Sequence, residues 1–220
     1  MLKWWKISGV VLILYTIVWG LLNTVPRLDI LNETIRNVYY HVPIWFAMLF
    51  QMGLSVVYAI KQLAKNDLHS DLISNQAAQT GLFFALPGLL TGCMWAKFTW
   101  LTWWTFKDPK LNGVAIAVLI YLAYFILRSS IEDEQKKARI AAVYNIFAFV
   151  MMFVFIMILP RITDSLHPGN GGNAKFAQYD MDNNLRTVFY PAVIGWILLS
   201  LWIFDVKKRI AILTQKKNEE

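Results

Sequence analysis

Hydrophobic side chains gather in six long stretches that are separated by polar segments. Each stretch mixes Leu, Phe and Met with Val and Ile and lacks a two-residue alternation, which favours helices over the strands of a membrane barrel. A helix of about 20 apolar residues crosses the hydrocarbon core of a bilayer, which is about 30 Å thick. The pattern predicts an all-α, polytopic membrane protein, a six-transmembrane helix bundle with spans at about 7–22, 42–60, 77–95, 111–127, 140–159 and 187–204.

The composition agrees with a single six-helix membrane domain over residues 1–220. Hydrophobic residues make up 57% of the chain and charged residues only 16%, whereas an average soluble domain has about 25% charged residues. The net charge is +7, but no basic stripe or nucleic-acid-binding motif accompanies it. We therefore expect the lipid bilayer as the surroundings and no nucleic acid as a partner. Motifs for ATP hydrolysis or hydrolase chemistry are absent from the sequence, so we expect no enzyme activity and no ATPase of its own.

The distribution of Lys and Arg predicts the orientation of the spans. These residues are more frequent beside the two termini and in the connections at about 61–76 and 129–139 than in the other three connections. Loops on the cytoplasmic side of a membrane carry the excess of positive charge. Both termini are thus expected in the cytoplasm, and the longer segments at about 23–41, 96–110 and 160–186 are expected to share the outer face.

Tryptophan is concentrated in one outer segment, at about 95–111. Four of the ten tryptophans of the chain lie there: Trp95, Trp100, Trp103 and Trp104. If this segment is helical, the spacing of three and four places the last three rings on one side. One interpretation is an interfacial aromatic belt, and the other is a platform for a flat hydrophobic ligand. The composition alone leaves both open.

Two of the three histidines are also expected on the outer face. His41 opens the second span and His167 precedes the sixth, whereas His69 lies in an inner connection. Neutral imidazole is a usual axial ligand of haem iron, and two histidines can hold one iron from opposite sides. Cys93, the single cysteine, has no C-x-x-C-H motif, so a haem here would be bound non-covalently. The alternative is that each is an interfacial histidine without a ligand.

Arg36 lies five residues before His41, near the predicted membrane surface. A guanidinium group suits the carboxylates of a ligand such as the propionates of haem. An arginine that binds lipid headgroups is the alternative interpretation.

Three local sequences together resemble the CcmC family, the haem-handling proteins of bacterial cytochrome c maturation. They are Arg36-Asn-Val-Tyr-Tyr-His41-Val-Pro43, the tryptophan-rich segment from Trp95 to Leu111, and Ser165-Leu166-His167-Pro168-Gly169. The family shares a tryptophan-rich WWD motif with larger haem lyases, but six spans are too few for the lyase role. In the family a Trp is directly followed by the Asp of the motif, whereas this chain has Phe106-Lys107-Asp108. The following Pro-Lys-Leu favours a one-residue insertion before Asp108, and the alternative is that Lys107 replaces the acid.

The resemblance implies a haem-binding protein that presents haem b at the periplasmic face of the bacterial inner membrane. It implies that His41 and His167 are the axial ligands of the haem iron and that Arg36 lies at the haem edge. It also places Trp95, Trp100, Trp103, Trp104 and Asp108 in the haem-contacting segment. The implied partners are an ABC-type complex of an ATPase and a membrane subunit, and a periplasmic haem chaperone (CcmE-like) that receives the haem. The alternative function is a membrane b-type cytochrome that carries electrons, for which ligands within the bundle are more usual.

Overall fold

The computed structural model describes residues 3–27, 31–163, 165–167 and 181–219, and within these residues it contains helices and no strand. Six helices are long and apolar enough to cross a membrane. The prediction of an all-α protein with six spans is therefore confirmed. The helical elements are α1 (Trp4–Leu22), η1 (Asn32–Tyr39), α2 (His41–Lys65), α3 (Leu68–Trp100), α4 (Pro109–Ser129), α5 (Glu134–Phe153), η2 (Val154–Ile158), α6 (Leu159–Ile162) and α8 (Asn183–Glu219).

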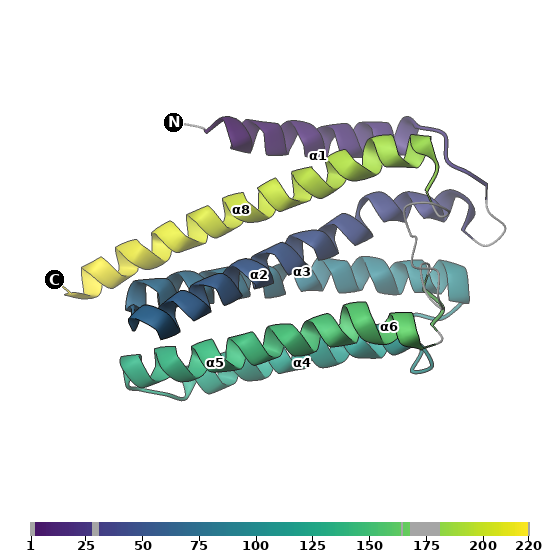
Figure 1. Ribbon diagram of the computed structural model, residues 1–220. Coiled ribbons are helices and arrows are strands. Elements are labelled where there is room, and N and C mark those ends of the chain that lie inside the picture. The colour runs from purple at the N-terminus through teal and green to yellow at the C-terminus, as the bar shows by residue number, and fades with distance from the viewer. Residues whose placement is uncertain (1–2, 28–30, 164, 168–180, 220) are drawn as a thin grey trace.

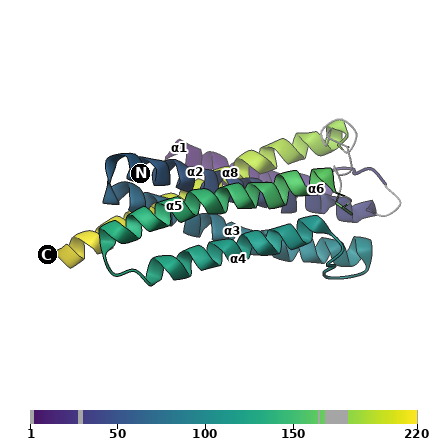
Figure 2. The same ribbon diagram turned by 60° about the horizontal axis from the view of Figure 1, so that its bottom comes forward.

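The long helices form three layers of two (Figure 1). Helix α1 packs along α8, α2 packs along α3, and α4 packs along α5, which η2 and α6 prolong. The α2–α3 layer lies in the middle, since α2 and α3 both contact α8 on one side and α5 on the other. The view in Figure 2 keeps α4 and α5 side by side in the same way. The middle layer thus holds the other two together.

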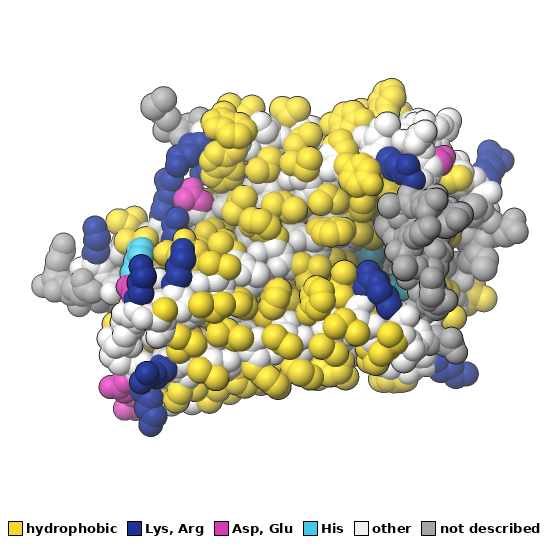
Figure 3. All heavy atoms as spheres, in the orientation of Figure 1, with side chains coloured by type: hydrophobic (Ala, Val, Ile, Leu, Met, Phe, Trp, Pro, Cys, Tyr) yellow, Lys and Arg dark blue, Asp and Glu magenta, His cyan; other side chains and the backbone are white. Residues whose placement is uncertain are grey.

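The two ends of the bundle differ in their connections. The start of α1, the end of α8 and the turns after α2 and α4 lie at one end, which we call the N/C end (Figure 1). The described parts of the connections, at 23–27, 31–40, 101–108, 165–167 and 181–182, lie at the other, which we call the loop end. On the face shown in Figure 3, hydrophobic side chains cover the middle, and Lys and Arg gather toward the two ends. The two ends of the chain therefore group at one side, and the described parts of the three longer segments group at the other, as the sequence predicts.

The helices extend farther than the hydrophobic stretches predict. The expected connection at 61–76 is mostly helical, and only Asn66 and Asp67 separate α2 from α3. Asn66 adopts a positive φ of 50° and the Asp67 side chain accepts from the backbone N–H groups of His69 and Ser70, which ends one helix and begins the next. The residues around this turn include good helix formers such as Lys, Gln and Leu, so the helices continue past the apolar stretch.

Helices α2 and α3 approach closely at two glycines of α3. His41 and Trp45 lie one turn apart on α2 and pack on Gly92 and Gly88, which lie one turn apart on α3. A Cβ atom on Gly92 would lie 2.7 Å from His41 Cε1, and one on Gly88 would lie 2.9 Å from Trp45 Cε2. Small residues let membrane helices come this close. The glycines thus fix the position of the His41 ring at the loop end.

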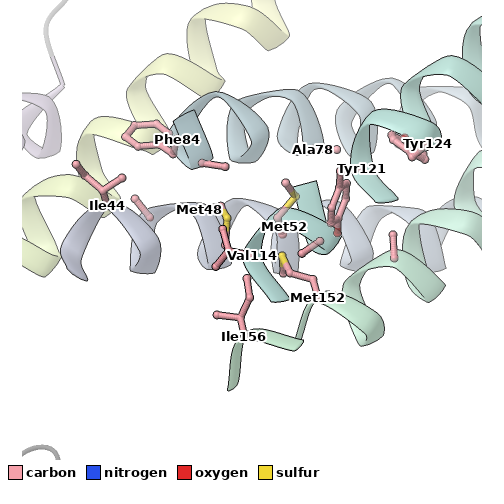
Figure 4. Close-up of a cluster of buried hydrophobic side chains, with 14 of the residues drawn as sticks. Ile44, Met48, Met52, Ala78, Phe84, Val114, Tyr121, Tyr124, Met152 and Ile156 are labelled. Carbon is pink, nitrogen blue, oxygen red and sulfur yellow. The ribbon is translucent and has the colours of Figure 1, made fainter. Parts of the chain in front are cut away.

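The interior between the layers combines a hydrophobic cluster with polar ties. Met52, Val114 and Met152 lie together in the cluster between α2, α4 and α5 (Figure 4). Toward the N/C end, Asn145 Nδ2 on α5 donates to Ser55 Oγ on α2 at 2.6 Å, and Ser55 Oγ donates to the Ser74 carbonyl on α3 at 2.7 Å. Hydrogen bonds between helices are a main source of specific packing where lipid surrounds the protein. Asn145 therefore joins three helices.

Replacing Asn145 with alanine should destabilise the bundle by about 0.6–2 kcal/mol, the range measured for such bonds in membranes. The free energy of unfolding in mixed micelles measures this change. Ser129→Ala is the matched control, because the exposed Ser129 hydroxyl bonds only to the carbonyl of Ile126 on its own helix. An Asn145→Ala protein as stable as the control would contradict the role of this tie.

Candidate functional site

The loop end brings His41 and His167 together, although they are far apart in the sequence. His41 is the first residue of α2, and His167 follows α6 in a non-helical segment. The two imidazoles are close enough to interact electrostatically. His69, the second residue of α3, lies at the opposite end of the bundle. The structure therefore unites the two outer histidines and keeps the third away from them, as the sequence predicts.

The ring of His41 is oriented by a threonine of α3. His41 Nδ1 lies 3.1 Å from Thr91 Oγ1, and the Thr91 hydroxyl donates its single proton to the Pro87 carbonyl at 2.8 Å. The Thr91 oxygen can therefore only accept from the histidine. In the neutral imidazole, Nδ1 then carries the hydrogen and Nε2 keeps the lone pair. This is the tautomer that a metal ligand through Nε2 requires.

The ring of His167 is oriented in the same way by a carboxylate. His167 Nδ1 lies 3.1 Å from Asp108 Oδ1. An ionised carboxylate only accepts hydrogen bonds, so Nδ1 is again the donor, and in the neutral ring Nε2 again keeps the lone pair. Metal-binding histidines commonly have this arrangement, in which a second group fixes the tautomer and the direction of the ring.

Asp108 is fully buried and is bound by several donors at once. Its Oδ1 accepts from the backbone N–H of Leu111 at 2.9 Å, which caps α4, and its Oδ2 accepts from Ser165 Oγ at 2.6 Å and from the backbone N–H of Leu166 at 2.8 Å. Burial opposes ionisation, but the hydrogen bonds from His167 and Ser165 outweigh it and hold the pKa of Asp108 well below its usual range. One charged group thus joins the start of α4 to the segment that carries His167.

The environment also keeps His167 neutral. Burial lowers the pKa of His167 below its ordinary value, and the positive charge of Lys110 lowers it further, whereas the Asp108 carboxylate partly offsets both effects. A neutral imidazole is the form that binds a metal. His167 is therefore ready to act as a ligand at neutral pH.

The tryptophans of the segment at 95–111 do not form one helical face. Trp95 and Trp100 belong to the last turns of α3, and Leu101, the residue after the helix, has a positive φ of 60°. Trp103 and Trp104 follow in a non-helical segment, and Trp103 is 57% exposed. The sequence aligns the three rings only if the segment is helical. It is not helical beyond Trp100, because Leu101 turns the chain between Trp100 and Trp103.

Two of these rings still lie directly against the histidines. The Trp95 ring centroid is 5.9 Å from that of His41, and the Trp100 centroid is 5.1 Å from that of His167, both edge to face. Trp45 is a third such ring, 6.1 Å from His41. Trp45 is not evident from the sequence, because an isolated Trp within a span carries no pattern. Its place four residues after His41 is the one signal that could have found it.

Arg36 is bound to the end of α1. Its Nη1 donates to the carbonyls of Gly20 and Asn23, each at 2.7 Å, and its Nε donates to Glu33 at 2.8 Å. These bonds satisfy carbonyls that the end of a helix leaves without a partner. A role of Arg36 toward a carboxylate ligand stays a prediction. The cation that interacts electrostatically with both histidines is Lys110 at the start of α4.

The site suits a metal that brings most of its own ligands. Among the described residues, no three His, Cys, Asp or Glu side chains gather to hold a bare metal ion. Two neutral imidazoles with free Nε2 atoms, lined by indole rings, are what the iron of a porphyrin requires as axial ligands. Fold and site together define a six-span membrane protein with a paired-histidine site at one membrane face.

Comparison with known proteins gives the family. The family described as CcmC, heme exporter protein C, matches residues 1–220. The heme exporter protein C of Rhodobacter capsulatus is 30% identical over 100% of this chain and 90% of its own length. Those of Paracoccus denitrificans and Escherichia coli K12 are 27% and 24% identical, over 94% and 98% of this chain and 85% of their own lengths. The chain belongs to the CcmC family, and the resemblance of the three local sequences is confirmed.

The pKa of His167 should lie below the ordinary histidine value of about 6.5, and Asp108→Asn should lower it further. The reason is that the carboxylate is the group that favours the imidazolium, while burial and Lys110 disfavour it. NMR titration of the three histidine rings measures both values, with assignment by single His→Gln variants. A pKa that rises in Asp108→Asn would contradict this electrostatic arrangement.

Proposed function

We propose that the protein holds one haem at the loop end and presents it to a partner during the maturation of c-type cytochromes. The observation that carries the proposal is the matched orientation of His41 and His167, each with Nδ1 engaged and Nε2 free. Membership of the CcmC family supports haem as the ligand and haem export as the process. The two Nε2 atoms would be the axial ligands of the haem iron.

The surrounding side chains would hold the porphyrin by its faces and its carboxylates. Trp95 and Trp100 would contact it beside the ligands, and Trp103 and Trp104 would contact it from the exposed segment. Lys110 would receive a propionate, because it is the cation that interacts with both histidines. The resemblance to the family places Arg36 at the haem edge. Arg36 would bind a propionate there through Nη2, because Nη1 donates to carbonyls at the end of α1. Binding would be non-covalent, as haem b, since Cys93 has no C-x-x-C-H motif.

The proposed orientation places the loop end in the periplasm and both termini in the cytoplasm. The excess of Lys and Arg at the N/C end supports it, because positive loops stay inside. A periplasmic haem chaperone would then take the haem from the exposed loop end of a protein in the bacterial inner membrane. An ABC-type complex would supply the energy, which fits a sequence without an ATP-binding motif.

The site position favours presentation over electron transfer. A carrier that moves electrons across the membrane usually binds haem between facing helices inside the bundle. Here the histidine pair lies where α2 begins and after α6, at the edge of the helical bundle. Trp103 and Phe106, which precede Asp108 in the segment between α3 and α4, are exposed, at 57% and 85%. A haem at this edge is accessible to another protein.

Replacing His41 or His167 with alanine should lower the haem that co-purifies with the protein, because each substitution removes one axial ligand. His69→Ala is the matched control and should retain the haem content of the wild type. Absorption spectra in detergent measure haem per chain, and acid-acetone extraction should remove all of it. Loss of haem in His69→Ala would contradict the site, and haem that resists extraction would contradict non-covalent binding.

Replacing Trp103 with alanine should weaken haem retention and leave the fold intact. The ring is exposed and outside the helices, so its loss should not change thermal stability. Loss of its contact with the porphyrin should cost about 1–3 kcal/mol if stacking on nucleobases is a fair guide. Haem dissociation to an acceptor protein and thermal unfolding are the two measurements. If Trp103→Ala retains haem as well as the wild type, the ring belongs to an interfacial belt only.

A further inference from the structure

The two histidines of the site have hydrogen-bond partners that differ in charge. His41 Nδ1 and His167 Nδ1 each lie 3.1 Å from an oxygen atom. For His41 this oxygen belongs to the neutral hydroxyl of Thr91, and for His167 it belongs to the carboxylate of Asp108. A hydrogen bond to an ionised acceptor is about twice as strong as one between neutral groups. The two rings therefore share a tautomer and a distance but differ in the charge beside them.

The contacts of Asp108 favour its ionised form. Its Oδ1 accepts from two backbone N–H groups at the start of α4, at 2.9 and 3.0 Å, and from the His167 ring. Its Oδ2 accepts from the Ser165 hydroxyl and from the backbone N–H of Leu166. Each donor engages a lone pair that a proton would otherwise occupy. His167 is thus bonded to a group that carries a full negative charge.

Burial strengthens the effect of this charge on His167. Asp108 is fully buried, so water does not screen it, and an electrostatic interaction grows as the local dielectric constant falls. Lys110 also acts on His167, but it acts on His41 as well. Lys110 therefore does not distinguish the two rings, whereas the hydrogen bond to Asp108 does.

A carboxylate that accepts from the outer nitrogen of a histidine makes the ring a better ligand. It draws the Nδ1 proton toward itself, so the ring gains electron density and Nε2 becomes more basic. The proton stays on Nδ1, because four other donors share the carboxylate charge. Hydrogen bonding around an axial ligand is one way in which a protein tunes haem. Added electron density at that ligand favours the ferric iron, which carries more positive charge than the ferrous iron.

We propose that Asp108 makes His167 a stronger electron donor than His41 and thereby lowers the reduction potential of the bound haem. The inference rests on the proposed function, since it requires both histidines to bind the iron. Asp108 is a positioning residue, because it acts through His167 and not by contact with the iron. A movement of His167 away from Asp108 weakens the bond to the iron, since the ring then loses the charge beside it.

Redox titration of the haem-loaded full chain in detergent tests the effect of the charge. Asp108→Asn should raise the midpoint potential, because a neutral amide replaces the carboxylate. A tenfold loss of preference for ferric over ferrous haem, the lower end of the usual effect of such a partner, corresponds to about 59 mV for one electron. An unchanged or lower potential in Asp108→Asn would overturn the proposal.

Asp182→Asn is the matched control for the loss of a carboxylate. Asp182 is exposed at the same end of the bundle, and its side chain accepts from the backbone N–H of Leu185 at the start of α8. Asparagine caps a helix as well as aspartate does. The potential of Asp182→Asn should equal that of the wild type, and an equal rise in both variants would overturn a specific role of Asp108.

A second measurement leaves Asp108 in place and so does not depend on the folding of Asp108→Asn. In His41→Gly the ferrous haem has His167 as its histidine ligand, and in His167→Gly it has His41. Resonance Raman spectroscopy measures the iron–histidine stretching frequency, which rises with the donor strength of the ring. The frequency should be higher in His41→Gly than in His167→Gly, and equal or reversed frequencies would overturn the proposal.

The failure of this inference differs from the failure of the proposed haem site. Wild-type protein whose haem iron binds fewer than two histidine nitrogens would contradict the site itself. Two bound histidine nitrogens, together with equal stretching frequencies and an unchanged potential in Asp108→Asn, would overturn the role of Asp108 alone.

Discussion

The arrangement of the loop end depends on a single buried carboxylate. Asp108 is fully buried, and its two oxygens accept from backbone groups of α4 and of the segment after α6, from the Ser165 hydroxyl and from the His167 ring. A buried charge is tolerated only when donors surround it. Asp108 can be buried only when these donors surround it, and the donors from α4 and from the segment after α6 are held together by their bonds to Asp108. The start of α4 and the position of His167 are therefore coupled through Asp108.

The second histidine is fixed by different means. His41 stands on a long helix, and its ring lies against Gly92 and bonds to Thr91 on the neighbouring helix. Its position follows from the close approach of α2 and α3 in the middle layer. One histidine thus belongs to a long helix of the bundle, and the other belongs to a non-helical segment that hydrogen bonds to Asp108 hold in place. If the protein presents haem as proposed, the bond to His167 is the one that can open without unfolding the bundle.

Hydrophobicity alone predicts the six helices, because a bilayer requires every backbone group within it to be paired in a helix. It does not predict where the helices end, since α3 continues from Leu68 to Trp100, well beyond its apolar stretch. The histidine pair follows from the topology and from the local motifs. Thr91 and the full set of Asp108 contacts do not follow, because they are contacts between segments far apart in the sequence. The bonds of Arg36 to the end of α1 do not follow from the sequence either, because they also join separate segments.

In the proposed haem site, the Nε2 atoms of His41 and His167 both bind one haem iron. Electron–nuclear double resonance on the ferric protein, with histidine labelled with ¹⁵N, counts the histidine nitrogens bound to the iron. We expect two in the wild type and in His69→Gly, and one in each of His41→Gly and His167→Gly. Two bound histidine nitrogens that persist in His41→Gly or His167→Gly would contradict this ligand pair.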